Sequence, residues 1–301
     1  MHDILALLQE YPEVVHEETE SAGRLPAAVA RLARRDLDVL VVNGGDGTLQ
    51  HALTELLVRR PCGRLPLLAP LRGGRTNMGA LDLGADRDPV RGLRGLLEDA
   101  RAGRLRSRLV KRPVLRIEVD RGHRVEYGMF FGVGMIRRAI SLTHQLFPSG
   151  RSQGGFGAGL VTLGLVAKAV FRPREGVLEP DKIQIRLDRE SVPAGEFYLA
   201  IATSLERLFW RIDPFWGPGS GPVRFTCVSS NARHIPRAAP GILRGRPGPV
   251  ASPRNGYMSA RVEQAQLLFH SGFTIDGELF PSRADQTVTL SGDERLTFVR
   301  A

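Results

Sequence analysis

The chain has little lysine, little cysteine and no long apolar run. Only three of its 42 basic residues are lysines: Lys111, Lys168 and Lys182. The two cysteines, Cys62 and Cys227, lie far apart, which excludes a disulfide framework and a cysteine metal site. The longest weakly polar run, residues 154–171, is interrupted by a lysine and falls short of the about 20 apolar residues that span a bilayer. We therefore expect a protein of a reducing compartment, with a buried or interfacial helix over residues 159–171.

The charge balance is basic but is not patterned for nucleic acid. Lys and Arg number 42 against 32 Asp and Glu, a net charge of +10, and no run of five like charges occurs. Such a surface suits phosphates or an anionic membrane, so we expect no nucleic-acid partner. The hydrophobic fraction is 42% of 301 residues, which is typical of a globular protein of about two domains. The first residues carry acids and no apolar signal core, so we expect a cytoplasmic protein.

The first hundred residues alternate between helix and strand patterns. A continuous apolar run at residues 38–42 is typical of a buried parallel strand, and apolar residues recur with helical spacing over residues 49–58. The other expected strands cover residues 14–19 and 65–69, and the other expected helices cover residues 3–10, 26–35 and 90–99. This order predicts an α/β domain with a parallel sheet over residues 1–108.

From residue 109 to the end, strand patterns follow one another between Gly/Pro-rich joints. Ile183, Ile185 and Leu187 alternate with polar residues, which is the period of a half-buried strand. The pattern predicts a C-terminal antiparallel β-sandwich domain over residues 109–301. The fold class is thus α/β followed by β.

One stretch indicates a ligand-binding site: Asp38-Val-Leu-Val-Val-Asn-Gly-Gly-Asp-Gly-Thr-Leu49. A buried strand runs into the glycine-rich turn Gly44, Gly45, Asp46, Gly47, Thr48 and then into a helix. Glycines allow close approach of a ligand, and free N–H groups at a helix start favour a phosphate. Thr48 is expected as the helix N-cap. Asp46 beside phosphates would be repelled unless it holds a cation, so it is a candidate Mg²⁺ ligand. The alternative is a plain turn whose aspartate caps the helix.

These residues resemble the GGDGT signature of diacylglycerol kinases, sphingosine kinases and bacterial lipid kinases, which NAD kinases and phosphofructokinases share more distantly. Two further elements support the lipid-kinase branch. Residues 70–78, Pro-Leu-Arg-Gly-Gly-Arg-Thr-Asn-Met, are similar to the family's P-x-G-T-x-N stretch. Residues 276–278, Asp-Gly-Glu, resemble its DGE motif.

The resemblance implies a small α/β domain, a β-sandwich, and transfer of the γ-phosphoryl group of ATP to a lipid hydroxyl with Mg²⁺. It also implies that a second loop helps to form the nucleotide site: Gly73, Gly74, Arg75, Thr76 and Asn77. Thr19 occupies the position of a threonine that often contacts the nucleotide. The family's DGE supplies the base.

Phosphoryl transfer needs a group that takes the hydroxyl proton. Asp276 and Glu278 lie two residues apart, so on a strand they would share a face. We expect Asp276 to be the base, with Glu278 as the second candidate. The alternative is that Asp276-Gly277 is a hairpin turn followed by a solvated glutamate.

The chain departs from the family's pattern at several positions. The family's first strand, which ends in an Asn-Pro-x-Ser-Gly-like turn, is not seen before residue 44, so we expect the α/β domain to lack it; an upstream start is the alternative. Arg75 replaces a threonine, and would either pair with a phosphate or block the nucleotide. His51 and Gln50 replace the usual Glu and Asn. An acidic segment that often precedes DGE has no counterpart.

The expected partner is a lipid substrate, met by peripheral contact with the inner membrane face; the oligomeric state stays open. Phe209, Trp210, Phe215 and Trp216 would line a lipid entrance or pack a loop. Arg137 and Arg138 would reach a phosphate or remain surface residues. Two alternative functions stay open: an NAD kinase-type enzyme, and a degenerate member that binds a nucleotide or lipid without turnover.

Overall fold

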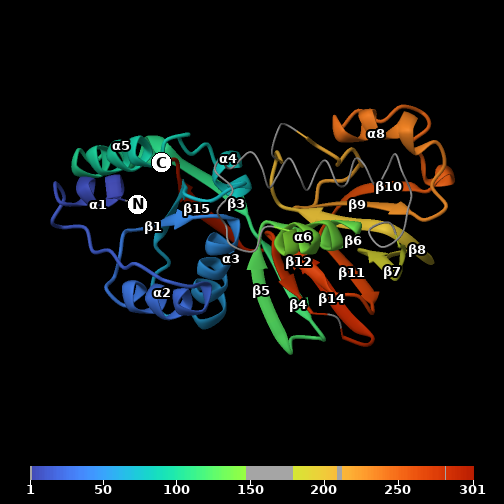
Figure 1. Cartoon of the computed structure of the whole chain (residues 1–301), viewed down its shortest axis with the longest axis horizontal. Helices are drawn as coiled ribbons and strands as arrows, with labels where there is room; N and C mark the ends of the chain where they lie inside the picture. Colours follow the sequence, from blue (N-terminus) through green and yellow to red (C-terminus); the bar gives the residue numbers. More distant parts are fainter. Residues whose placement is uncertain (1, 147–178, 209–211, 282) are drawn as a thin grey trace. The chain divides into compact units, whose positions relative to one another are not determined.

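The structure is a computed structural model that describes residues 2–146, 179–208, 212–281 and 283–301. It contains two compact units, shown in Figure 1. The first comprises Met1–Arg112 together with Arg295–Ala301, and the second comprises Pro113–Glu294. Residues 109–112 and the last seven residues were expected in the second domain, but they belong to the first unit.

The first unit is built on a four-stranded sheet in the order β1-β2-β15-β3. Its strands are β1 (Val39–Gly44), β2 (Leu67–Arg72), β15 (Arg295–Val299) and β3 (Leu109–Pro113). β1 pairs parallel with β2, and β15 pairs parallel with β2. The C-terminal strand therefore completes a sheet that the first hundred residues begin.

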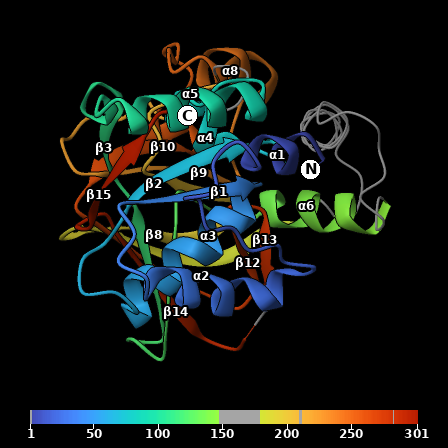
Figure 2. The same cartoon turned by 90° about the vertical axis from the view of Figure 1, so that its left-hand side faces the viewer.

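Helices cover both faces of this sheet (Figures 1 and 2). On one face lie α1 (His2–Leu8) and α5 (Pro89–Arg101), whose leucines pack on Ala69, Leu71 and Val299. On the other face lie α2 (Leu25–Ala33) and α3 (Asp46–Thr54), which continues into a π-helical turn, Glu55–Arg59. The remaining helices are α4 (Met78–Asp82) and the 3₁₀ turns Ala22–Arg24 and Leu105–Arg108.

The expected strand over residues 14–19 is wrong. These residues have no strand assignment, although their neighbours in space include the free edge of β1. A strand needs a hydrogen-bonded partner strand. A cavity is lined on one side by this segment and on the other by β1, so the segment makes no strand hydrogen bonds with β1. The other expected elements of this unit are present with shifted ends.

The second unit is an eleven-stranded antiparallel sheet. Its strands along the main path are β13 (Glu278–Phe280), β12 (Phe273–Ile275), β6 (Phe130–Gly134), β8 (Glu190–Thr203), β7 (Asp181–Leu187), β11 (Gln264–Phe269), β14 (Gln286–Ser291), β4 (Leu115–Val119) and β5 (Arg124–Gly128). Off this path, β9 (Val223–Ser229) pairs with β8, and β10 (Tyr257–Val262) pairs with β9. The helices are α6 (Met135–Leu146), α8 (Ile235–Leu243) and the 3₁₀ turn Pro253–Asn255.

The long strand β8 joins the two halves of this sheet. Its first half pairs with β7, its second half runs between β6 and β9, and register shifts mark the change. Strands that pass from one half of a packed sheet to the other make the corners of such folds. The two halves bury one common core. The expected α/β plus antiparallel β fold is confirmed, with the β unit formed as one continuous sheet.

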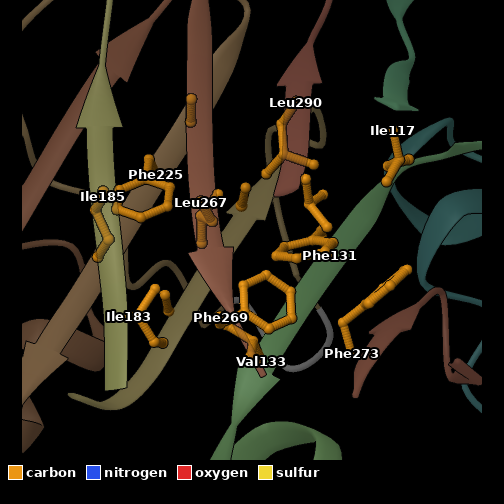
Figure 3. Packing of buried hydrophobic residues seen from close by; sticks show 14 of the residues in the cluster. Ile117, Phe131, Val133, Ile183, Ile185, Phe225, Leu267, Phe269, Phe273 and Leu290 are labelled. Atoms are coloured by element: carbon orange, nitrogen blue, oxygen red, sulfur yellow. The ribbon is translucent and has the colours of Figure 1, made fainter. Parts of the chain in front are cut away.

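The core of the second unit follows the alternation seen in the sequence. On β7, Ile183, Ile185 and Leu187 are buried while the residues between them are exposed. Figure 3 shows Ile183 and Ile185 with the aromatic rings of β6, β9, β11 and β12. Phe273 stacks on Phe280 with ring centroids 4.8 Å apart. The Phe273 ring also lies 5.5 Å from that of Phe131 and 6.2 Å from that of Phe269 between centroids, which fixes the short hairpin β12–β13 to the rest of the sheet.

Candidate functional site

Two glycine-rich loops leave the first unit's sheet at the same edge. β1 and β2 are parallel and in register, with Asn43 opposite Leu71 and Gly44 opposite Arg72. The first loop, Gly44–Thr48, continues β1 into α3, and the second, Gly73–Asn77, continues β2 into α4. The carboxyl ends of parallel strands are where α/β proteins bind their ligands. The structure thus brings together both loops that the sequence singles out.

The glycines of the two loops are packed against one another. A Cβ atom on Gly74 would lie 2.2 Å from the Cα of Gly45, and one on Gly73 would lie 2.3 Å from Oδ1 of Asn43. Similarly, a Cβ on Gly44 would lie 2.5 Å from the Cβ of Thr48. Side chains cannot be accommodated at these distances. Glycine is therefore required here because one loop closely approaches the other. The expected reason was different, namely that the glycines allow a ligand to approach.

Asn77 closes the second loop on itself. Its Oδ1 accepts a hydrogen bond from the backbone N–H of Gly74, and its Nδ2 donates to the carbonyl oxygen of Gly74, each at 2.7 Å. Asn77 is buried and has φ 51°, a left-handed conformation that asparagine tolerates better than most residues. It is also the residue before α4. The expected binding residue is thus a part of the loop's own framework.

Asp46 links the first loop to the helix that follows the second. It is the first residue of α3, and its Oδ1 accepts a hydrogen bond of 2.8 Å from the backbone N–H of Gly79 in α4. Burial raises the pKa of the Asp46 carboxyl, while the N–H groups of Met78, Gly79 and Asn77 act in the opposite direction. An acidic side chain at these N–H groups satisfies donors that α4 itself leaves free.

The N-terminus of α3, in contrast, has no side-chain cap. Its N-cap residue is Gly45, so the expectation that Thr48 caps the helix is wrong; α3 begins two residues earlier, and Thr48 lies in its first turn. The first N–H groups of a helix have no partner within the helix. Because no side chain caps them, they form a site suited to a phosphate.

The described residues do not form a metal site by themselves. No group of three or more His, Cys, Asp or Glu side chains close enough to hold a metal occurs among the described residues. Asp46 would have to bind the ion alone, and its carboxylate already accepts hydrogen bonds from the backbone at α4. Asp46 as a ligand of Mg²⁺ therefore stays a prediction.

A cavity of about 990 Å³ runs along the free edge of β1 inside the first unit. It is mostly apolar, being lined by side chains of β1, α2 and α5. At the carboxyl end of β1 its lining becomes polar with Asn43 and Thr48, and the exposed Thr19 lies on the segment across from β1. Its volume lies within the range of about 300–1,000 Å³ usual for ligand pockets.

Asn43 is a site residue to which the sequence analysis gave no role. Its Oδ1 is buried and has no hydrogen-bond partner among the described residues. Buried polar atoms are normally satisfied, so an orphaned acceptor in a cavity wall suits a donor supplied by a ligand. The only signal in the sequence was its place directly before the GGDGT turn.

The residues that depart from the family's pattern, Arg75, Gln50 and His51, lie on or near the loops. Arg75 is half-buried and has no ion pair with any described residue. Thr76, beside it, is also half-buried. Gln50 is fully buried in α3 and donates a hydrogen bond of 3.1 Å to Oγ1 of Thr54, while His51 is half-buried on the same helix. Gln50 therefore serves the packing of α3.

In the second unit, Asp276 and Gly277 form the two-residue turn between β12 and β13. Their φ angles are 48° and 91°, and positive φ at both central residues defines a type I′ hairpin turn. The expectation that Asp276 and Glu278 share one strand face is wrong, because Asp276 lies in the turn and Glu278 begins β13.

The carboxylate of Asp276 is held by backbone donors. Its Oδ2 accepts a hydrogen bond from the N–H of Met129, and its Oδ1 accepts one from Phe130, each at 2.8 Å. Asp276 is buried, and a Cβ on Gly128 would lie 2.6 Å from its Oδ2. The side chain thereby ties the β12–β13 turn to the turn between β5 and β6.

Glu278 differs from Asp276 in every one of these respects. Its side chain is half-buried, and its carboxylate has no hydrogen bond or ion pair with any described residue. Its contacts are made by the backbone, which pairs with Ile275 across the hairpin and accepts a hydrogen bond from Oγ1 of Thr274 at its carbonyl oxygen. A carboxylate with free lone pairs is the better proton acceptor of the two.

The other candidates are mostly structural. Phe215 is buried, and Trp216 packs on the small cluster around α8, so both pack a loop. Arg138 pairs with Asp181, whereas Nε of Arg137 is buried without a hydrogen-bond partner among the described residues. Phe209, Trp210 and the expected helix at residues 159–171 lie outside the described residues. Across the part of the chain that is described, no helix is both long and apolar enough to cross a bilayer.

Comparison with known proteins supports the resemblance. Residues 1–106 match the family model of the diacylglycerol kinase catalytic domain. A crystal structure of a diacylglycerol kinase from Bacillus anthracis str. Sterne has a TM-score of 0.61 at 15% identity, covering 100% of this chain and 90% of its own. A second structure from that organism gives a TM-score of 0.66 at 17% identity, covering 100% of this chain and 89% of its own. No curated protein matches the sequence of this chain. These structural likenesses establish a shared fold.

Proposed function

We propose that this chain, whose residues 1–106 match the diacylglycerol kinase catalytic domain, is a kinase that transfers the γ-phosphoryl group of ATP to the hydroxyl of a lipid. One observation carries the proposal: the uncapped N-terminus of α3 is held by two interlocked glycine loops, next to a cavity with an orphaned acceptor on Asn43. This arrangement suits a nucleotide, because phosphates favour the helix N-terminus and the nucleoside has hydroxyl and amino donors.

The first unit would bind and orient the nucleotide. Backbone N–H groups of Gly47 and Thr48 would receive a phosphate, and Arg75, which has no ion pair with a described residue, would add a cation from the second loop. Thr19 and Asn43 line the cavity and would contact the nucleoside. Positioning and charge stabilisation are the main contributions a protein makes to phosphoryl transfer.

The second unit would supply the proton acceptor. As the lipid hydroxyl oxygen bonds to the γ-phosphorus, the bond from that phosphorus to the β-phosphate oxygen breaks, giving ADP and a phosphorylated lipid. The hydroxyl proton passes to a carboxylate. We assign this role to Glu278, whose carboxylate has no partner among the described residues, and assign to Asp276 the positioning of the turn.

We expect the activity to depend on Mg²⁺ that is held mainly by the phosphates of ATP. Mg²⁺ is commonly held through substrate phosphates and waters with one or two carboxylates. An ion that arrives with ATP would neutralise phosphate charge. A chelator in the assay tests this expectation directly, and activity that persists in excess chelator would contradict it.

The test is transfer of labelled phosphate from ATP to lipids dispersed in detergent. Diacylglycerol, monoacylglycerol and a sphingoid base are offered separately, with NAD as a further acceptor. A labelled lipid that disappears in the Gly74→Ala variant and persists in Gly23→Ala supports the proposal, because a Cβ on Gly23 would contact nothing within 4 Å. Labelled NADP would instead indicate an NAD kinase. ATP binding in calorimetry with no product from any acceptor would indicate a degenerate member.

The proposed setting is the cytoplasmic face of a membrane, where the acceptor lipid is found. The support for this setting is the lipid acceptor of the proposed reaction and the basic charge of the chain.

A further inference from the structure

One long stretch of the second unit carries positive charge alone. From Pro214 to Val262 the sequence has no aspartate or glutamate and has seven arginines. The stretch covers β9, the connection that follows it, and β10. Acid-free stretches also occur at residues 56–81 and 127–174, so what distinguishes this one is how its arginines are placed in the structure.

Five of these arginines lie in the connection between β9 and β10, residues 230–256, which we call the α8 connection. All five are exposed, and none has an ion pair or a side-chain hydrogen bond with any described residue: Arg233, Arg237, Arg244, Arg246 and Arg254. The nearby Asp213, which touches the end of α8 through its backbone, has its carboxylate paired with Arg224. The charge of the connection is thus not compensated locally.

This isolation is not a general result of high arginine content. Elsewhere in the chain, exposed arginines commonly have acidic partners: Arg31 pairs with Glu17, Arg91 with Asp86, and Arg94 with Glu10. Five unpaired guanidinium groups in one connection therefore form a distinct surface.

Helix α8 presents both charge and apolar surface outwards. Its inner side is anchored, because Ala238 and Ile242 are buried against Tyr257, Ala251 and Trp216. On its outer side, Arg237 and Arg244 are seven residues apart and hence within about 20° of the same direction around the helix. Between them the outer side carries Pro240 and Leu243, and Leu243 is 40% exposed. Figure 1 shows α8 standing beside β9 and β10.

We propose that the α8 connection docks the protein on an anionic lipid surface. Unpaired arginines provide the charge complementarity, and exposed Leu243 and Pro240 provide apolar groups that can enter the headgroup boundary. Nucleic acid fits less well, since single strands are bound by stacking on aromatic side chains and the chain has no Phe, Tyr or Trp between Phe225 and Tyr257. The biological role of this docking rests on the proposed lipid kinase function, but vesicle binding can be measured without turnover.

The experiment is co-sedimentation of the full chain with phosphatidylcholine vesicles, with or without phosphatidylglycerol, in the absence of nucleotide and acceptor lipid. We expect binding only to the anionic vesicles and loss of binding at high salt. The test variant is the double substitution Arg237→Gln/Arg244→Gln. Each basic residue near an anionic surface contributes about five-fold to binding, so the double variant should bind about 25-fold more weakly.

The matched control removes the same charge from the same unit. Arg186→Gln/Arg189→Gln changes two exposed arginines that have no ion pair with a described residue, and it should alter binding only slightly. Leu243→Ser should weaken binding at low salt without changing the salt dependence, because it removes an exposed apolar group and no charge. Equal weakening by both double variants, equal binding to neutral vesicles, or tighter binding to a nucleic acid than to anionic vesicles would each overturn the proposal.

The kinase assay separates this proposal from the proposed function. Arg237→Gln/Arg244→Gln should retain turnover on lipid dispersed in detergent while losing vesicle binding. If the wild-type chain has no kinase activity but binds vesicles through the α8 connection, the docking surface stands and the proposed function fails.

Discussion

Asn77 and Gly74 are joined by two hydrogen bonds of 2.7 Å that run in opposite directions. These two bonds of the Asn77 amide hold Gly74 in the position where it contacts Gly45. The integrity of the two glycine-rich loops thus depends on a residue that the family motif suggests as a ligand contact.

The first prediction concerns Asn77 itself. Asn77→Gly removes both side-chain hydrogen bonds but keeps a residue that adopts positive φ, and should lower the free energy of unfolding by about 1–3 kcal/mol. Asn77→Ala should cost about 1 kcal/mol more, because alanine is strained in the left-handed region. Urea unfolding measures both values. Equal stabilities for the Gly and Ala variants would contradict the conformational part of the argument.

The second prediction concerns the contact between the loops. Gly74→Ala places a Cβ 2.2 Å from the Cα of Gly45, so the loops must separate, with a loss of about 1–3 kcal/mol in stability and loss of ATP binding. Gly23→Ala is the control, since nothing lies within 4 Å of the added atom, and its stability should be unchanged or slightly higher. Calorimetric ATP binding by Gly74→Ala at wild-type affinity would show that the contact is dispensable.

The third prediction separates the two acidic residues of the second unit. Asp276→Ala leaves the N–H groups of Met129 and Phe130 without their acceptor and should lower stability by about 2–5 kcal/mol. Glu278→Gln removes no contact with a described residue and should change stability by less than about 0.5 kcal/mol.

Activity then decides which carboxylate takes the proton. If Glu278 is the acceptor, Glu278→Gln should lower kcat by about 10²–10⁴-fold while the melting temperature stays the same. Full activity in Glu278→Gln, combined with an inactive but folded Asp276→Asn, would return the role to Asp276.

The fourth prediction concerns pH and the buried thiol. Burial raises the pKa of Cys227 to about 12, so at pH 8.5 the native protein holds about three orders of magnitude less thiolate there than an ordinary cysteine would. A thiol reagent should label the half-buried Cys62 first and Cys227 only after unfolding. A Cys62→Ser variant should therefore react with the reagent only in denaturant.

The raised pKa of Cys227 also determines the direction in which folding stability changes with pH. The unfolded thiol releases its proton near pH 8.5, and the folded one only near pH 12, so the folded state binds more protons between these values. The stabilising effect of the raised pKa is complete below about pH 8.5 and is lost as pH rises towards 12. Replacing Cys227 by alanine should flatten the fall in stability over this alkaline range.

Much of the local structure was predictable because it follows from periodicity and turn chemistry. The buried run at residues 38–42 forms β1, and the alternation of Ile183, Ile185 and Leu187 forms a half-buried strand. The strand expected at residues 14–19 failed because β propensity is expressed only where a partner strand is hydrogen-bonded, and none reaches this segment. Likewise, the C-terminal strand β15 belongs to the first unit, since pairing between distant segments leaves no local signal.

The sequence by itself determined the two kinds of secondary structure, the glycine-rich loops that follow β1 and β2, and the hairpin signal at Asp276-Gly277. These are local properties, set by side-chain spacing and by which residues tolerate positive φ. Only the tertiary structure decided what each polar side chain does. Asp46 binds backbone N–H groups of α4, Asp276 binds those of Met129 and Phe130, and the carboxylate of Glu278 contacts no described residue. Those assignments depend on contacts between segments up to 147 residues apart, which no local pattern records.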